Sequence, residues 1–139
     1  MIATLERVSG LRFPEREIEA IVYEGISWAG AVGSPMRMRA SYPPETKKAT
    51  LIHELGHRHI AQLKRRPAEL DEHRVLFLFL YDVWEHLYGK GFADEQVEVE
   101  QKRQGVYDYK TAWEWALAQS QEERAKRFQA ILRDNERGG

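Results

Sequence analysis

Residues 47–65 read KKATLIHELGHRHIAQLKR, and this stretch decides the fold. Its small and apolar residues recur at intervals of three and four positions: Ala49, Ile52, Gly56, Ile60 and Leu63. That spacing is typical of a helix with one apolar face. Thr46 is suited to cap the helix. Pro67 is expected to end it, because proline lacks an amide hydrogen and disfavours helix in the residue before it.

The flanking segments predict a strand before this helix and a second helix after it. Met36–Ala40 alternates apolar and charged side chains, which favours a half-exposed strand that ends before Pro43. A second helix is expected over Ala68–Tyr88, where Gly89 and Gly91 stop it. Between Val75 and Tyr81 this helix is apolar around most of its circumference, so we expect it in the middle of the fold.

The two ends of the chain complete an α+β prediction that is predominantly helical. Residues 1–13 fit either a short strand or an irregular packed arm, and residues 14–22 show helical spacing. Three further helices are expected: over residues 94–104, around residues 113–117, and after a capping box of Ser120 and Glu123. The whole is a single domain over residues 1–139, with a small sheet near its N-terminus.

The amino-acid composition suits a single globular domain and excludes several kinds of functional site. The 139 residues and 16.3 kDa suit one domain, and 42% hydrophobic residues suffice for a packed core. With 21 basic against 22 acidic residues, no nucleic-acid partner is expected from bulk charge. The chain has no cysteine, which excludes disulfides and thiolate metal sites. Any metal must therefore be held by His, Asp or Glu.

Nothing in the sequence predicts a membrane or an export signal. The longest apolar run, Val75–Tyr81, is far shorter than the about 20 residues that a membrane-spanning helix needs. The N-terminal residues include charges and no apolar signal region. We therefore expect a cytoplasmic protein without a membrane partner; the sequence leaves its oligomeric state open.

The motif that carries chemistry is His53-Glu54-Leu55-Gly56-His57, which matches H-E-x-x-H inside the predicted helix. Residues four apart project from the same helix face, so His53 and His57 can converge on one zinc ion. Glu54 lies about 100° further round the helix, where it misses the metal but can reach a water molecule bound to it. The spacing thus predicts a zinc site with Glu54 as general base.

The strand, the motif helix and the helix that follows resemble the zincin metallopeptidases over residues 36–86. They look most like the minimal gluzincin-type members and the bacterial domain that cleaves phage repressors. The resemblance implies that His53 and His57 bind zinc and that Glu54 is the general base. It also implies that Met36–Ala40 pairs with an extended peptide substrate and that the next helix supplies an acidic ligand.

The third metal ligand has several candidates. Leu63 stands six residues after His57, so the third histidine of the metzincins is absent. Glu72 is the expected ligand, because it lies near one end of the second helix on the face that Val75, Leu76 and Phe79 turn toward the core. His73 would instead make a three-histidine site, and Asp82 is a further alternative. Other residues of suitable type on that helix are Asp71, Glu85 and His86.

The expected chemistry is zinc-assisted hydrolysis of a peptide bond. Zinc with three protein ligands keeps a position for water and lowers its pKa toward about 7. Glu54 would accept the proton as the water attacks a carbonyl, and would then deliver it to the leaving amine. Tyr107, Tyr109 and His86 have side chains able to stabilise the oxyanion. His59 lies on another side of the helix and is expected to be a supporting or surface histidine.

The sequence therefore predicts a small zinc-dependent peptidase that acts on a peptide or protein substrate. An alternative is a zincin-like domain that keeps zinc for a regulatory or protein-interaction role without efficient proteolysis. A third possibility is a helical interaction protein in which the motif is accidental.

Overall fold

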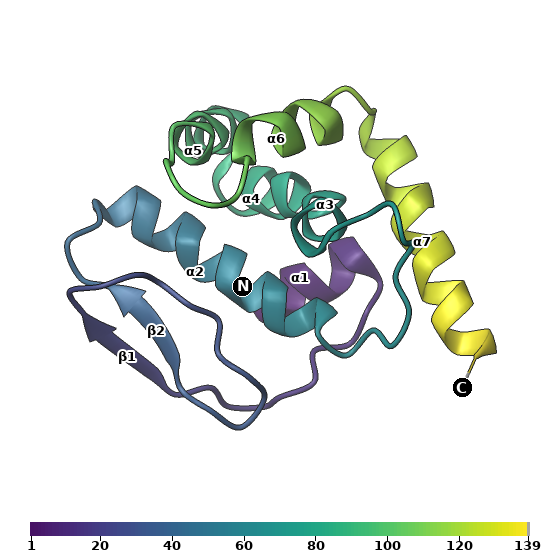
Figure 1. Cartoon of the computed structure of the whole chain (residues 1–139), viewed down its shortest axis with the longest axis horizontal. Helices are drawn as coiled ribbons and strands as arrows, with labels where there is room; N and C mark the ends of the chain where they lie inside the picture. The colour runs from purple at the N-terminus through teal and green to yellow at the C-terminus, as the bar shows by residue number, and fades with distance from the viewer. Residues whose placement is uncertain (139) are drawn as a thin grey trace.

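The computed structural model describes residues 1–138. Its elements in chain order are α1 (Ile2–Ser9), β1 (Ala20–Tyr23), β2 (Met36–Arg39), α2 (Pro44–Ile60), α3 (Glu72–Phe77), α4 (Leu80–Tyr88), α5 (Lys90–Gln101), α6 (Tyr109–Leu117) and α7 (Gln121–Arg137). Figure 1 shows the small sheet on one side of α2 and the helices α3 and α4 on the other, with α5 and α6 beyond them. The predicted helical α+β class is confirmed.

The sheet consists of β1 and β2, which run parallel. Within β2, Met36 and Met38 are buried, whereas Arg37 and Arg39 are exposed. The buried methionines lie on the side of β2 that packs against α2. The predicted half-exposed strand is confirmed.

Both hydrogen-bonding edges of β2 have partners within the chain. β1 occupies one edge. At the other edge, the amide and carbonyl groups of Trp28 pair with those of Arg37 at 2.9 Å. The Ser27 hydroxyl oxygen accepts from the amide of Arg39 at 3.0 Å. The expected pairing of residues 36–40 with an extended peptide is therefore wrong for this structure, because the chain after β1 turns back and takes that position.

The motif helix is present as α2, which starts three residues and ends five residues before the expected limits of residues 47–65. Pro43 is the capping position, and Thr46 lies buried within the first turn instead of capping it. Gly56 lets α3 approach closely, since a Cβ atom at this position would lie 2.3 Å from Cδ1 of Leu76. The small residue inside the motif thus helps to bring α3 beside the two histidines.

The second predicted helix is divided into α3 and α4, so the expectation of one continuous helix over Ala68–Tyr88 is wrong. Residues 68–71 precede α3 and are not helical. At the junction, the amides of Leu78 and Phe79 bond to carbonyls only three residues back, which tightens the turn. Gly89 ends α4 as expected, but Gly91 lies inside α5. Every residue from 75 to 84 is buried, which confirms the predicted central position.

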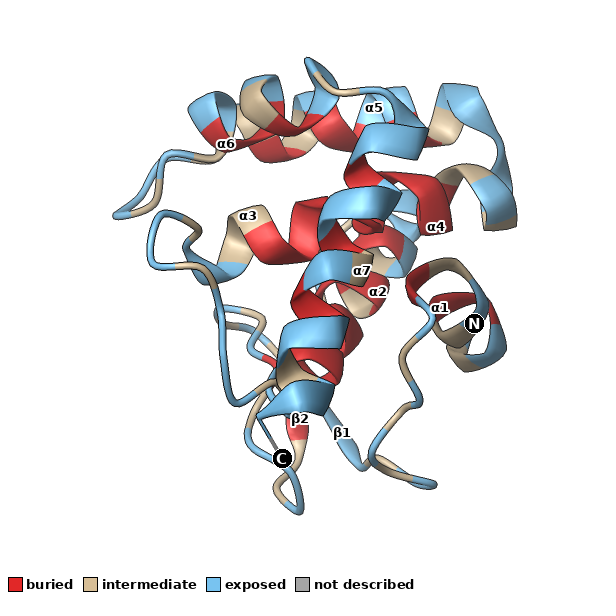
Figure 2. Cartoon of the chain, turned by 90° about the vertical axis from the view of Figure 1, so that its right-hand side faces the viewer, coloured by how far each residue is buried: buried red, intermediate tan, exposed pale blue. Residues whose placement is uncertain are grey.

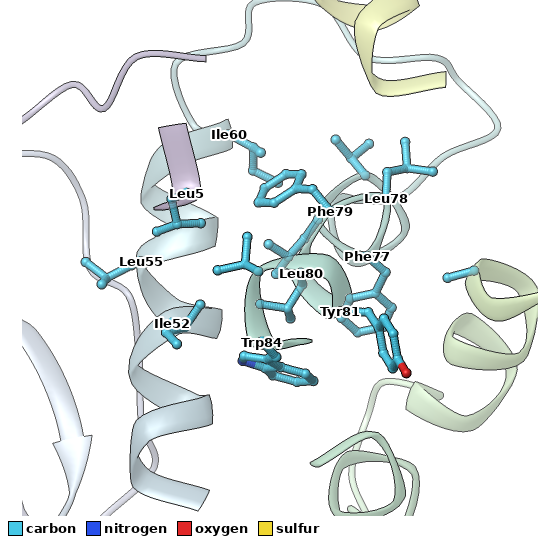
Figure 3. Close-up of a cluster of buried hydrophobic side chains, with 14 of the residues drawn as sticks. Leu5, Ile52, Leu55, Ile60, Phe77, Leu78, Phe79, Leu80, Tyr81 and Trp84 are labelled. Atoms are coloured by element: carbon cyan, nitrogen blue, oxygen red, sulfur yellow. The ribbon is translucent and has the colours of Figure 1, made fainter. Parts of the chain in front are cut away.

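The core lies where α2 meets α3 and α4. Figure 2 shows the buried faces of these helices turned toward one another, and Figure 3 shows large apolar side chains filling the space between them. Ile52 and Ile60 of α2 and Phe77 and Trp84 of the central pair are each at most 1% exposed. Across residues 1–138, no helix has both the length and the apolar character that crossing a membrane requires.

The N-terminal predictions are wrong in two places. Residues 2–9 form α1 rather than a strand or an irregular arm. Residues 14–19 are not helical, and the expected helix over residues 14–22 is replaced by β1. The residues at 21–23, Ile-Val-Tyr, are branched or aromatic and favour a strand once β2 offers hydrogen-bonding partners.

The C-terminal helices follow the prediction more closely. The capping box is confirmed, since Ser120 and Glu123 exchange side-chain and backbone hydrogen bonds at the start of α7. Helix α7 is tied to the core by a buried ion pair between Arg124 and Asp82 of α4. Two nitrogens of Arg124 donate to the two carboxylate oxygens at 3.2 and 2.7 Å.

Loss of the Arg124 guanidinium is expected to destabilise the fold. Both side chains of the pair are only 5% exposed, so Arg124→Met leaves the Asp82 carboxylate buried and unpaired. The free energy of unfolding should fall by about 3 kcal/mol. Urea denaturation followed by circular dichroism measures it.

Two control variants test the cause. Asp82→Leu combined with Arg124→Met removes both charges and should recover most of the loss. Lys126→Met removes an exposed partner of Glu122 and should cost less than about 1 kcal/mol. A double variant as unstable as Arg124→Met alone would contradict the account.

Candidate metal centre

Three histidines meet between α2 and α3. His53 and His57 are one helical turn apart on α2, and His73 follows the first residue of α3. One ring nitrogen of each lies within 4.8 Å of the others. We call this group the three-histidine cluster. The structure therefore brings together both histidines of the motif, as the spacing predicted, and adds His73, which was an alternative third ligand.

Each motif histidine has one ring nitrogen in the cluster and the other beside a carboxylate. Nε2 of His53 and Nε2 of His57 face each other at 3.1 Å. Nδ1 of His53 lies 2.6 Å from a carboxylate oxygen of Glu100, and Nδ1 of His57 lies 2.8 Å from one of Glu72. Because carboxylates only accept, both Nδ1 atoms carry the hydrogen, and in the neutral rings both Nε2 lone pairs point into the cluster.

When both rings are neutral, the two facing lone pairs repel, and a shared proton or a metal ion between them relieves the repulsion. Nitrogens bound to a tetrahedral zinc at about 2.0–2.1 Å are about 3.3 Å apart, close to the observed separation. Carboxylates on the far nitrogens of the ligands are the usual support of such a site. The three histidines could therefore hold a metal ion, and their nitrogen donors are of the type that zinc binds.

Glu100 of α5 fixes His53 from inside the protein. Its side chain is 3% exposed, and it also accepts from the indole nitrogen of Trp113 at 2.8 Å. Burial would by itself raise the pKa of Glu100, but His53, Arg103 and Trp113 together hold it below its ordinary value. Burial would likewise lower the pKa of His53, and the charge and hydrogen bond of Glu100 raise it instead. The imidazole is thus held in one orientation by a buried charge.

His73 is held in the cluster by two tyrosine rings. Tyr107 stacks on it with ring centroids 4.2 Å apart, and Tyr109 meets it edge to face at 5.1 Å. Burial, followed by repulsion from His53 and His57, lowers the pKa of His73 to about 3. His73 is therefore neutral at neutral pH and keeps a lone pair for a metal ion.

Glu72, the expected third ligand, lies at the edge of the cluster. Its carboxylate bonds to Nδ1 of His57, on the opposite side of that ring from Nε2. This hydrogen bond is the main cause that lowers the pKa of Glu72. Neighbouring helix residues point about 100° apart, so Glu72 and His73 cannot both face the same point. In this structure His73 belongs to the cluster, and Glu72 bonds to His57 from outside it.

Four other sequence candidates do not belong to the three-histidine cluster within the part of the chain that the structure describes: Asp71, Asp82, Glu85 and His86. Asp82 is engaged by Arg124 in the buried ion pair. Asp71 caps α3 and accepts from the hydroxyl of Tyr107 at 2.9 Å. His86 is exposed and contacts Arg7 of α1.

His59 is neither a surface histidine nor a support of the cluster. It is fully buried on another side of α2, stacks on Phe13, and lies 2.8 Å from the hydroxyl oxygen of Ser9. Burial lowers its pKa to about 4. The expectation for His59 is therefore wrong, because α1 and the segment after it cover this side of α2.

A pocket of about 350 Å³ opens beside the cluster. Its lining comprises Ser27, Trp28, Ala29, Gly30, His53, Glu54, His57, Ala61, Glu72, His73 and Tyr109. We call it the histidine pocket. Glu54 is 8% exposed and shares this lining with the three histidines. The predicted general base therefore lies in the same pocket as the candidate metal ligands.

Arg58 fastens the outer wall of this pocket to α2. Its side chain is 1% exposed and donates to the carbonyl oxygen of Ala29 at 2.6 Å. It also donates to both carboxylate oxygens of Glu15 at 2.8 and 2.9 Å, and to the carbonyl oxygen of Ser34. Burial would raise the pKa of Glu15, but Arg58 and the amide of Gly33 lower it. A residue next to His57 thus positions the chain segment that faces the histidines.

Sequence reasoning missed Glu100, Arg58 and the role of Trp113 in the site. A signal for Glu100 does exist, because it falls on the same helical stripe as Ala93 and Val97, which are buried. An acidic residue on an apolar stripe needs a buried partner. For Arg58 the motif helix gives no such signal, since its partners come from residues 15–34.

Comparisons of the chain with protein-family models, with curated proteins and with solved structures find no match. The assignment of the site therefore depends on its own geometry.

Metal binding by two variants is expected to identify the third ligand. His73→Ala should reduce zinc affinity by more than about 100-fold, because it removes a ligand nitrogen of the cluster. Glu72→Gln should keep about one zinc per chain and weaken binding by about 10- to 100-fold, the usual effect of losing a supporting carboxylate. Competition with a chromogenic chelator measures both, and elemental analysis gives the stoichiometry.

The matched control is His86→Ala, which removes an exposed histidine outside the cluster and should leave affinity unchanged. If Glu72→Gln abolished binding while His73→Ala preserved it, Glu72 would be the ligand, as the sequence predicted. If the wild-type protein bound no zinc near neutral pH, the metal site itself would be refuted.

Proposed function

We propose that the chain is a zinc-dependent peptidase. The observation that carries the proposal is the three-histidine cluster, with its ligand nitrogens within 4.8 Å of one another, in one pocket with Glu54. An accidental H-E-x-x-H match has no reason to recruit a third histidine from another helix. It has no reason, either, to place carboxylates on the far nitrogens of both motif histidines.

Each group of residues around the pocket would have a separate role in such a site. Zinc bound there would supply a Lewis acid and a water nucleophile that is reactive at neutral pH. His53, His57 and His73 would hold the ion, and Glu100 and Glu72 would keep two of the imidazoles in the ligand tautomer. Ser27–Gly30, fastened by Arg58, would form the wall against which a peptide lies.

Glu54 would move the proton. Its position one residue after His53 directs it into the pocket rather than onto the ion. There it can accept the proton from the attacking water and return it to the nitrogen of the departing amine. The step needs a carboxylate that substrate can reach, and Glu54 lies in the lining of the open pocket.

Tyr109 is the best placed of the three proposed oxyanion donors. It lines the pocket, with its hydroxyl 3.4 Å from Nε2 of His73. Burial and the nearby Glu100 raise its pKa, so its proton stays in place at neutral pH. The hydroxyl of Tyr107 already donates to Asp71, and His86 lies against Arg7. We therefore assign oxyanion stabilisation to Tyr109.

Replacement of the general base should abolish turnover without releasing the metal. Glu54→Gln keeps the size of the side chain but cannot accept the proton, so hydrolysis should fall by at least about 100-fold. Zinc content should stay at about one per chain. Cleavage of an extended peptide mixture, followed by mass spectrometry, measures the rate.

Glu114→Gln on α6 is the matched control, because it makes the same chemical change at an exposed residue. Full activity in Glu54→Gln would show that the base is assigned wrongly. A wild-type protein that binds zinc but cleaves no peptide would instead support a regulatory or binding domain.

Removal of the Tyr109 hydroxyl should lower kcat more than it changes KM. The hydroxyl acts on charge that develops only in the transition state, so Tyr109→Phe should reduce kcat by about 100-fold. Tyr107→Phe is the control on the other side of His73, and it should have little effect on kcat. Equal losses in the two variants would mean that both rings only position His73.

A further inference from the structure

Arginine and aromatic side chains form a row that begins on the exposed face of β2. We call it the arginine–aromatic row: Trp28, Arg37, Arg39, Tyr42, Arg103 and Tyr109. Arg37 and Arg39 lie on the same face of β2, opposite the buried methionines. The guanidinium carbon of Arg37 lies 5.8 Å from the ring centre of Trp28, and that of Arg39 lies 5.7 Å from the ring centre of Tyr42.

The row continues from the sheet toward α6. The guanidinium carbon of Arg103, just after α5, lies 5.8 Å from the ring centres of both Tyr42 and Tyr109. Trp28 at one end of the row and Tyr109 at the other belong to the lining of the histidine pocket. The row therefore borders the histidine pocket at both of its ends.

The two arginines of β2 carry charge that the protein does not neutralise. Five arginines of the described chain form ion pairs with carboxylates, among them Arg58 with Glu15 and Arg124 with Asp82. Arg103 is 3.6 Å from Glu100. Among the ion pairs within residues 1–138, none involves Arg37 or Arg39. The only side-chain hydrogen bond from either guanidinium in that range goes to the hydroxyl of Ser41, at 3.3 Å.

A guanidinium lying near an aromatic ring is well prepared to bind a carboxylate. The ring restricts the side chain and leaves the N–H groups at the guanidinium edge free. Carboxylates accept from such an edge in pairs, with good geometry. Trp28 is 54% exposed, so the ring can also contact the apolar part of a bound peptide.

From these contacts we infer that the arginine–aromatic row binds acidic side chains of a peptide that extends from the histidine pocket. As a substrate preference, the inference rests on the proposed peptidase function; as a binding site, it stands without catalysis. Arg37 and Arg39 bind the carboxylates, and Trp28 and Tyr42 hold the guanidinium groups in place.

An acidic peptide fits the row better than a nucleic acid does. A phosphate backbone needs many cations along its path, whereas the row contains only two arginines outside ion pairs, and the chain carries a net charge of −1. The row also adjoins a pocket that contains the carboxylates of Glu54 and Glu72. Those carboxylates repel phosphates near the histidines, while a peptide presents only neutral amides there.

Fluorescence anisotropy with three labelled peptides tests the inference. The peptides share one Ala/Ser/Thr background of ten residues and carry two glutamates, two glutamines or two lysines. The full chain with Glu54→Gln, loaded with zinc, prevents cleavage during the measurement. We expect the glutamate peptide to bind at least about 10-fold more tightly than the glutamine peptide, and less tightly as salt is raised.

Combined replacement Arg37→Gln and Arg39→Gln should remove this preference. The matched control is Arg133→Gln with Arg137→Gln, which changes the same charge on exposed positions of α7. Circular dichroism verifies that both proteins are folded. Equal binding of the glutamate and glutamine peptides, or equal loss in both double variants, would overturn the inference. A labelled oligothymidylate that binds more tightly than the glutamate peptide, and depends on Arg37 and Arg39, would overturn it in favour of a nucleic-acid site.

Hydrolysis of the same peptides by the chain with Glu54 intact separates this inference from the proposed function. If the protein cleaves none of them but still prefers the glutamate peptide, the peptidase proposal fails and the acidic site stands. If it cleaves the glutamate and glutamine peptides with equal kcat/KM, and the arginine variants change nothing, the peptidase stands and the inference fails.

Discussion

The buried contact between His53 and Glu100 is the constraint on which the candidate site depends. A carboxylate inside a protein is costly unless charged or polar partners surround it. Glu100 meets this requirement with His53 of α2 and Trp113 of α6, so three helices must come together around one side chain. The same contact sets the tautomer of His53 and directs its Nε2 atom toward His57. The stability of the core and the chemistry of the cluster therefore share one group.

Two further features arrange the surroundings of the cluster. The close approach at Gly56 and the break between α3 and α4 set α3 beside α2, where His73 enters the cluster. Arg58, on the same helix as the histidines, fastens the facing segment Ser27–Gly30. One helix thus carries two candidate metal ligands, the candidate base and the anchor of the pocket wall. The residues that line the pocket all lie between positions 27 and 109.

The structure contains the strand and the motif helix that the sequence predicted, and it differs from the expectation beyond them. The edge of β2 that a peptide would occupy is taken by Trp28, and the wall of the pocket is the segment that includes it. The third member of the cluster is a histidine, with the neighbouring Glu72 outside it. Three neutral histidines add no charge to a bound metal ion. The supporting carboxylates therefore have more influence on the charge of such a site than they would have if one ligand were itself a carboxylate.

The sequence by itself determined the features that depend on short spacing. The alternation of Met36 to Arg39, the capping box at Ser120, and the pairing of His53 with His57 all follow from local geometry. The tertiary structure alone decided which of Glu72 and His73 faces the cluster. The two residues are adjacent on α3, so rotating this helix by about 100° about its axis would exchange their positions. The tertiary structure also decided that residues 20–23 form a strand and that Glu100 is buried. These outcomes depend on contacts between residues that are far apart in the sequence. Local spacing within one helix cannot predict that α2 and α5 lie side by side.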